Sequence, residues 1–112
     1  MALQHANSLD VIDISPLGAA LPGAMTHSLL KTPTLQLMRV VLRAGAGLPE
    51  HSVSGAITVL CIEGQTVVSA GARQCRLGAG QLVMLEGHEP HALLAVTDSS
   101  LLVTLLLQPA TA

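Results

Sequence analysis

Short runs of apolar residues, each separated from the next by glycine or proline, recur along the chain. Their spacing of about eight to twelve residues is typical of an all-β sandwich or barrel. No run has the length and period of an amphipathic helix, so no helix is predicted. The predicted strands are Leu9–Ile14, Met25–Lys31, Leu35–Arg43, Ala56–Ile62, Thr66–Ala70, Gln81–Leu85, His91–Val96 and Leu101–Leu107.

Two of the runs, Ile57–Ile62 and Leu101–Leu107, are apolar at both odd and even positions. Because strand side chains alternate between the two faces of a sheet, both faces of these strands are expected to be covered. The segment Glu63-Gly64-Gln65 between two runs predicts a tight hairpin in which Gly64 has a positive φ. Eight of the ten glycines lie within residues 45–87, where strands are expected to switch between two sheets.

The composition indicates a folded chain of one domain. Of the 112 residues, 50% are hydrophobic, 11% are charged and none is Phe, Trp or Tyr. This aliphatic content excludes intrinsic disorder. We therefore expect a single domain over residues 1–112, with an N-terminal arm of about residues 1–24 and a barrel of about residues 25–107.

The number and distribution of charged residues bear on nucleic-acid binding and on the cellular location of the protein. Five Lys and Arg against seven Asp and Glu give a net charge of −2, and no Phe, Trp or Tyr ring is present to stack on a base. Nucleic acid is therefore not expected as a partner. The first Lys or Arg is Lys31, and the uncharged segment Ile14–Leu30 is interrupted by proline and glycine. These features predict a cytoplasmic protein without a signal peptide and without a membrane partner.

Cys61 and Cys75 are the only thiols. Cys61 lies within an apolar run, where a thiol behaves as a small core residue. Neither cysteine has the close Cys or His neighbours of a zinc site. Both are expected to be reduced and structural.

Two histidines carry a resemblance to a known family. Gly45 precedes His51 by six positions, and Gly80 precedes His91 by eleven. With Ile62-Glu63-Gly64, this pattern resembles the two motifs of the cupins, in which histidines bind a metal. The likeness covers about residues 35–107 and implies a double-stranded β-helix, or jelly-roll barrel, with His51 and His91 at its mouth.

The sequence departs from the cupin pattern at two of the four ligand positions. Val53 stands where the pattern has a second histidine, and Ile57 where it has a glutamate. Two imidazoles alone hold a divalent transition metal weakly. We therefore expect no firmly held cofactor and at most a weakly bound Ni, Zn or Fe ion at His51 and His91, with His88 as a candidate third ligand. The alternative for His88 is an ordinary solvated loop residue.

Three functional hypotheses follow. The first is a small-molecule-binding or sensor cupin, whose aliphatic pocket is lined by His51, His91, Val53 and Ile57. The second is a metal-dependent oxygenase or isomerase with an incomplete histidine site. The third is a structural or interaction module, because the jelly-roll scaffold supports many functions.

Low charge also predicts self-association. With 11% charged residues, ionic groups cannot cover the surface of a domain of this size. We expect a homodimer with Met25–Lys31 and Leu35–Arg43 at the contact. Arg39 and Arg43 are expected on a solvated strand face or opposite acidic groups of the partner or a ligand, and Glu63 in a solvated turn.

Overall fold

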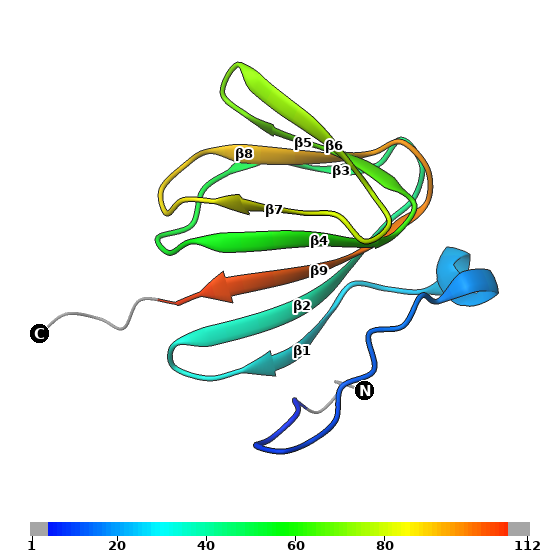
Figure 1. Cartoon of the computed structure of the whole chain (residues 1–112), viewed down its shortest axis with the longest axis vertical. Helices are drawn as coiled ribbons and strands as arrows, with labels where there is room; N and C mark the ends of the chain where they lie inside the picture. The colour runs from blue at the N-terminus through cyan, green and yellow to red at the C-terminus, as the bar shows by residue number, and fades with distance from the viewer. Residues whose placement is uncertain (1–4, 108–112) are drawn as a thin grey trace, which may run out of the picture.

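The computed structural model describes residues 5–107, and within them the chain forms two antiparallel sheets (Figure 1). The short 3₁₀ helix η1 spans Gly18–Gly23. The strands are β1 (His27–Lys31), β2 (Leu35–Leu42), β3 (Gly47–His51), β4 (Ile57–Glu63), β5 (Gln65–Ala70), β6 (Arg73–Gly78), β7 (Leu82–Leu85), β8 (His91–Ala95) and β9 (Ser99–Leu106). A five-stranded sheet has the order β1-β2-β9-β4-β7, and a four-stranded sheet has the order β3-β8-β5-β6.

The chain passes repeatedly from one sheet to the other, because β3, β5, β6 and β8 belong to one sheet and the other strands belong to the second. This alternation is the connectivity of a jelly roll. The all-β, jelly-roll prediction is therefore confirmed. A short η1 helix nevertheless forms where no helix was expected.

The hydrophobic core between the sheets consists of aliphatic side chains and one thiol. Cys61 is fully buried, and burial raises the pKa of its thiol, so this sulfur stays neutral in the core. Both cysteines are free, and Cys75, unlike Cys61, is exposed. The core residues are Val40, Leu42, Ile57, Val59, Cys61, Val68, Leu77, Leu85, Leu93, Ala95, Leu101 and Val103.

The N-terminal segment differs from the prediction of a strand at Leu9–Ile14. This segment has no regular structure, and the side chains of Leu9 and Val11 are 98% and 96% exposed. The amide of Asp10 donates instead to the carbonyl oxygen of Asn7 in a local turn. Apolar side chains that find no sheet face to cover do not stabilise a strand.

Two strands, β3 and β6, were not predicted. Both lie at an edge of the four-stranded sheet. All five residues of β3 are exposed, and they include Pro49, which an edge strand tolerates because one side of the strand needs no N–H donor. The strand β6 buries only Leu77. Edge strands are polar for this reason and lack the apolar alternation on which the prediction rests.

Gly64 has a positive φ of 87°, as predicted, but it does not close a hairpin. The strands before and after it, β4 and β5, belong to different sheets. Gly64 is therefore a corner at which the chain changes sheets. The adjacent hairpin is instead β5–β6, whose turn begins at Gly71 with φ 61°.

The N-terminal arm is fastened to the five-stranded sheet by two charged residues. Arg39 is 4% exposed, and its guanidinium donates to the carbonyl oxygens of Ser15 at 3.1 Å and Asp13 at 3.2 Å. The carboxylate of Glu63 accepts hydrogen bonds from the amides of Leu17 and Gly18 at 2.9 and 3.0 Å. The predictions of a solvated Arg39 and a solvated Glu63 are therefore wrong.

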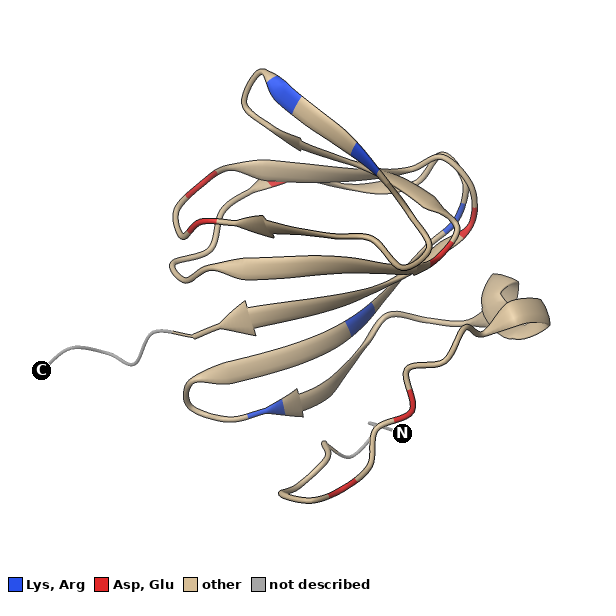
Figure 2. Ribbon diagram, in the orientation of Figure 1, with Lys and Arg blue, Asp and Glu red and all other residues tan. Residues whose placement is uncertain are grey.

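Charged residues are sparse on both sheets (Figure 2). Arg43, unlike Arg39, is exposed at the end of β2. Other charges lie in the turns and loops, including Glu86 and Glu89 between β7 and β8. Much of each outer sheet surface is consequently uncharged. No helix in residues 5–107 is long and apolar enough to cross a membrane.

Candidate functional site

A cavity of about 220 Å³ lies between the two sheets, at the end where β3 and β8 approach β2, β4 and β9. We call it the histidine cavity. Its polar side chains are Thr26, His51 and His91, and the others are aliphatic or thioether groups. The lining residues are Thr26, Met38, Val40, Leu48, His51, Val53, Ile57, Val59, His91, Leu93, Val103 and Leu105.

The ladder between β3 and β8 brings the two histidines together. His51 and His91 are register partners, and their ring centroids are 4.4 Å apart with the rings inclined at 61°. His91 is 3% exposed, whereas His51 lies on the exposed edge strand. One imidazole is therefore held inside the cavity, and the other stands at its mouth.

Backbone carbonyl groups fix the orientation of both rings. Nδ1 of His51 lies 3.0 Å from the carbonyl oxygen of Pro49, and Nδ1 of His91 lies 2.9 Å from that of Glu89. A carbonyl oxygen only accepts hydrogen bonds, so each Nδ1 carries the proton and donates it. In the neutral rings, Nε2 is left as an acceptor.

Nε2 of His91 is open to the cavity. Among residues 5–107, the one buried side-chain polar atom that has no hydrogen-bond partner is Thr66 Oγ1. Nε2 of the buried His91 makes no hydrogen bond in the same range, so it is not sealed by protein atoms. The cavity therefore offers a ligand at least one oriented nitrogen acceptor in aliphatic surroundings.

The structure brings four of the five proposed site residues together. His51, His91, Val53 and Ile57 all line the histidine cavity. His88 does not line it. This residue is exposed, has a positive φ of 66°, and donates its backbone N–H to the carbonyl oxygen of Val53 at 2.6 Å. His88 is therefore an exposed loop residue, and the candidate third ligand does not line the histidine cavity.

The residues present do not fit a resident metal. Transition metals in proteins need three or four nitrogen, oxygen or sulfur ligands. Within the described chain, no three His, Cys, Asp or Glu side chains lie where they could share an ion. Val53 and Ile57 place methyl groups in the wall of the cavity, and methyl groups cannot ligate a metal.

Several lining residues were not identified from the sequence, among them Met38, Val103 and Leu105. The alternation of side chains between the two faces of a strand identifies these residues. Val40 and Leu42 are buried core residues of β2, and Met38 shares their face. The same alternation places Val103 and Leu105 on the inner face of β9. A consistent use of period two would have found them.

The sequence profile of the cupin domain family matches residues 38–107, which is more than half of the chain. The chain therefore belongs to the cupin domain family. No curated protein matches the chain.

Solved structures share the fold at low sequence identity. A conserved protein of unknown function from Streptococcus pyogenes is 19% identical, with a TM-score of 0.76 over 98% of this chain and 97% of that one. A cupin superfamily protein from Desulfitobacterium hafniense is 18% identical, with a TM-score of 0.73 over 75% of this chain and 77% of that one.

An enzyme is also among the similar structures. A mutant of salicylate 1,2-dioxygenase from Pseudoaminobacter salicylatoxidans, in complex with gentisate, is 23% identical with a TM-score of 0.63. The match covers 69% of this chain but only 21% of the dioxygenase chain. At these identities the likeness establishes the fold and carries no activity across.

Proposed function

We propose that this cupin domain binds a small, largely apolar molecule that carries a hydrogen-bond donor, as a ligand-binding or sensor protein. The observation that supports this most strongly is the histidine cavity, in which an oriented imidazole acceptor faces aliphatic walls. Apolar walls with a few placed polar groups are the usual character of a small-molecule site. The ligand would bury its apolar part against the walls and donate its hydrogen bond to Nε2 of His91 or His51.

The size of the cavity limits the ligand. Its volume of about 220 Å³ exceeds the ~150 Å³ of an engineered apolar cavity that binds benzene. It is smaller than the ~300 Å³ at which pockets for drug-sized molecules begin. The proposed ligand is therefore a molecule with a single ring or a short branched chain.

Phenol and toluene form a matched pair of probes, since they differ by a hydroxyl in place of a methyl group. We expect phenol to raise the melting temperature more than toluene does at equal concentration, because only phenol donates a hydrogen bond to an imidazole. A ligand at a hundredfold excess over its Kd stabilises the folded state by about 2.7 kcal/mol.

Histidine variants locate the effect. His91→Leu and His51→Leu keep the apolar volume and remove Nε2, so at least one of them should abolish the advantage of phenol over toluene. His27→Leu, outside the histidine cavity, is the matched control. A wild-type protein that responds to neither probe, or a phenol advantage that survives in both cavity variants, would contradict the proposal.

A metal-dependent oxygenase or isomerase is the second candidate. The observation in its favour is that both imidazoles donate through Nδ1 to carbonyl groups, an outer-shell contact that metal-binding histidines commonly make. Titration with Ni²⁺, Zn²⁺ and Fe²⁺ tests it. Tight, stoichiometric binding that is lost in His51→Leu would favour this candidate. If no probe and no metal binds, the interaction module is the better hypothesis.

A further inference from the structure

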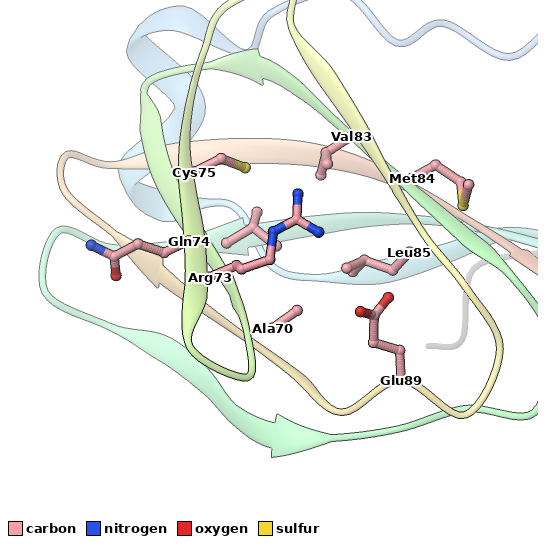
Figure 3. A pocket seen from close by; sticks show the side chains of 9 residues that line it. Ala70, Arg73, Gln74, Cys75, Val83, Met84, Leu85 and Glu89 are labelled. Carbon is pink, nitrogen blue, oxygen red and sulfur yellow. The ribbon is translucent and has the colours of Figure 1, made fainter.

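A second cavity opens at the other side of the sandwich, between the edge strands β6 and β7 (Figure 3). We call it the seam cavity. Its volume is about 160 Å³, and it shares no lining residue with the histidine cavity. Leu85 and Val68 line the seam cavity, while their ladder partners Ile57 and Leu93 line the histidine cavity. A buried row of side chains therefore divides the two.

The inner part of the seam cavity is apolar. Val68 and Leu85 are 3% and 5% exposed, and the half-buried Ala70 and Val83 lie beside them. Water at such a surface is readily displaced by an apolar group. The volume is close to that of the ~150 Å³ cavity that holds benzene, so a branched aliphatic side chain fits and a fused ring system does not.

The rim of the seam cavity carries one charge of each sign. Arg73 reaches in from the start of β6, and Glu89 from the loop that precedes β8. Figure 3 shows the guanidinium and the carboxylate pointing into the cavity from different sides, whereas Gln74 points away from it. No ion pair within 4.0 Å joins Arg73 to Glu89 in the described chain. The carboxylate accepts a hydrogen bond from the amide of Glu86 at 3.3 Å, which restrains its position.

This arrangement is complementary to a zwitterion with an apolar tail. A guanidinium offers a planar pair of donors that matches a carboxylate. A carboxylate accepts hydrogen bonds from an ammonium group. The apolar inner surface between them accommodates a hydrocarbon side chain. A simple fatty acid would leave the negative charge of Glu89 without an opposite charge, and a simple amine would leave the positive charge of Arg73 without one.

We propose that the seam cavity binds a free α-amino acid with an aliphatic side chain. Its carboxylate lies against Arg73, its ammonium group against Glu89, and its side chain on Val68 and Leu85. This site is independent of the function proposed for the histidine cavity. Each site can therefore be tested, and can fail, without the other.

L-Leucine is the probe, and three analogues dissect its binding. Glycine lacks the side chain, 4-methylpentanoate lacks the ammonium group, and isoamylamine lacks the carboxylate. Titrations of isotope-labelled protein followed by NMR should show L-leucine binding more tightly than any analogue. The shifted amide signals should fall in residues 68–89. Equal affinity for leucine and either singly charged analogue, or no shift with leucine, would overturn the proposal.

Substitutions of Arg73 and Glu89 test which residue binds each charged group of leucine. Arg73→Gln should weaken leucine binding by about three- to tenfold, while its effect on isoamylamine is small. Glu89→Gln should weaken leucine by a similar factor and leave 4-methylpentanoate little affected. Arg76→Gln and Glu50→Gln remove exposed charges outside the seam cavity and serve as matched controls. If the control variants weaken leucine binding as much as Arg73→Gln and Glu89→Gln do, the effect comes from the overall charge of the protein. The assignment of Arg73 and Glu89 to the two ends of leucine would then be overturned.

Cys75 supplies an independent measurement in the unmodified chain. Its sulfur points into the seam cavity, while the other thiol, Cys61, is fully buried. Alkylation by iodoacetamide should therefore occur at Cys75, and L-leucine should slow it. In His91→Leu the protection should be unchanged, because His91 lines the other cavity. Alkylation at the same rate with and without leucine would contradict binding at this position.

Discussion

Thr66 is a polar residue in the hydrophobic interior. Its side chain is fully buried on β5, and its hydroxyl oxygen has no hydrogen-bond partner within residues 5–107. An unsatisfied buried hydroxyl costs about 1–3 kcal/mol of stability. Thr66→Val keeps the shape and removes the hydroxyl, so we expect the free energy of unfolding to rise by about 1 kcal/mol.

Chemical denaturation measures this change. Thr104→Val, on the half-buried outer face of β9, is the matched control, because its hydroxyl is within reach of water. The control should alter stability by less than about 0.5 kcal/mol. A loss of stability in Thr66→Val would mean that the hydroxyl has a partner in solution.

Glu63 joins the arm to the barrel through its charge. Burial raises the pKa of this carboxyl, but hydrogen bonds from Ser100 Oγ and the amides of Leu17 and Gly18, with the nearby charge of Arg39, outweigh burial. The net result is a pKa below the ordinary value of 4.5. A carboxyl whose pKa is lower in the folded state stabilises the fold above its unfolded pKa. This stability is lost as the pH falls through the folded pKa.

We therefore expect Glu63→Gln to lower the free energy of unfolding by about 1–3 kcal/mol at pH 7. The difference from the wild type should shrink as the pH falls below 4.5, the ordinary pKa of the carboxyl. Denaturation curves at a series of pH values measure it, with Glu50→Gln on exposed β3 as the control. A difference that does not change with pH would show that the charge of Glu63 is not what holds the arm.

At the scale of the elements, apolar periodicity predicted the interior strands and both edges of the five-stranded sheet, but it failed at the two edges of the four-stranded sheet. The prediction of β2, β4 and β9 was correct because these strands carry apolar side chains of the buried core. The strands β3 and β6 were missed because an edge strand has little to bury. Leu9–Ile14 has an apolar pattern, but this segment pairs with no sheet and forms no strand. An apolar pattern in the sequence indicates which residues are buried. A strand that buries few side chains has no such pattern and is not predicted from it.

The corner between β4 and β5 depends on Gly64. A Cβ atom at this position would lie 2.2 Å from the carbonyl oxygen of Asp98 and would also require a positive φ. Gly71 has a positive φ as well, but a Cβ atom there meets no atom within 4 Å. Gly71→Ala should therefore cost about 1–3 kcal/mol from backbone strain alone.

Gly64→Ala should cost clearly more than Gly71→Ala, because the backbone of Asp98 must also move. Thermal unfolding of the two variants side by side measures the difference. Equal losses of stability would show that the corner relaxes without strain.

At the scale of the whole molecule, the histidine cavity was predicted in outline. The resemblance to the cupin motifs implied that His51 and His91 share one cavity, and strand pairing explains why the two rings meet. The seam cavity was not predicted, because Arg73 and Glu89 come from an unpredicted edge strand and a loop. The seam cavity forms where the edges of the two sheets diverge. The position of this gap depends on tertiary structure and cannot be predicted from a local sequence pattern.

The outer face of the five-stranded sheet carries a row of leucines. Leu82, Leu60 and Leu102 are direct neighbours across β7, β4 and β9. Leu82 is 60% exposed, and the other two are half-buried, so the expectation that both faces of β4 and β9 are covered holds for only one face of the described chain. Arg39, the next residue in this row, lies beneath the arm. It cannot form the expected ion pair across a dimer axis.

We propose that a second copy of the chain covers this leucine row in a two-fold dimer. Leucines in a contiguous apolar patch are typical of an association surface, and a stable homodimer buries roughly 2,000 Å² or more.

Light scattering at micromolar concentration should give about twice 11.5 kDa. Leu82→Lys should shift the protein toward the monomer, because a buried ammonium without a partner is costly. Leu94→Lys, an exposed position on the four-stranded sheet, should leave the dimer intact. A wild-type monomer at high concentration, or equal effects of the two lysine variants, would place the dimer contact elsewhere or exclude it.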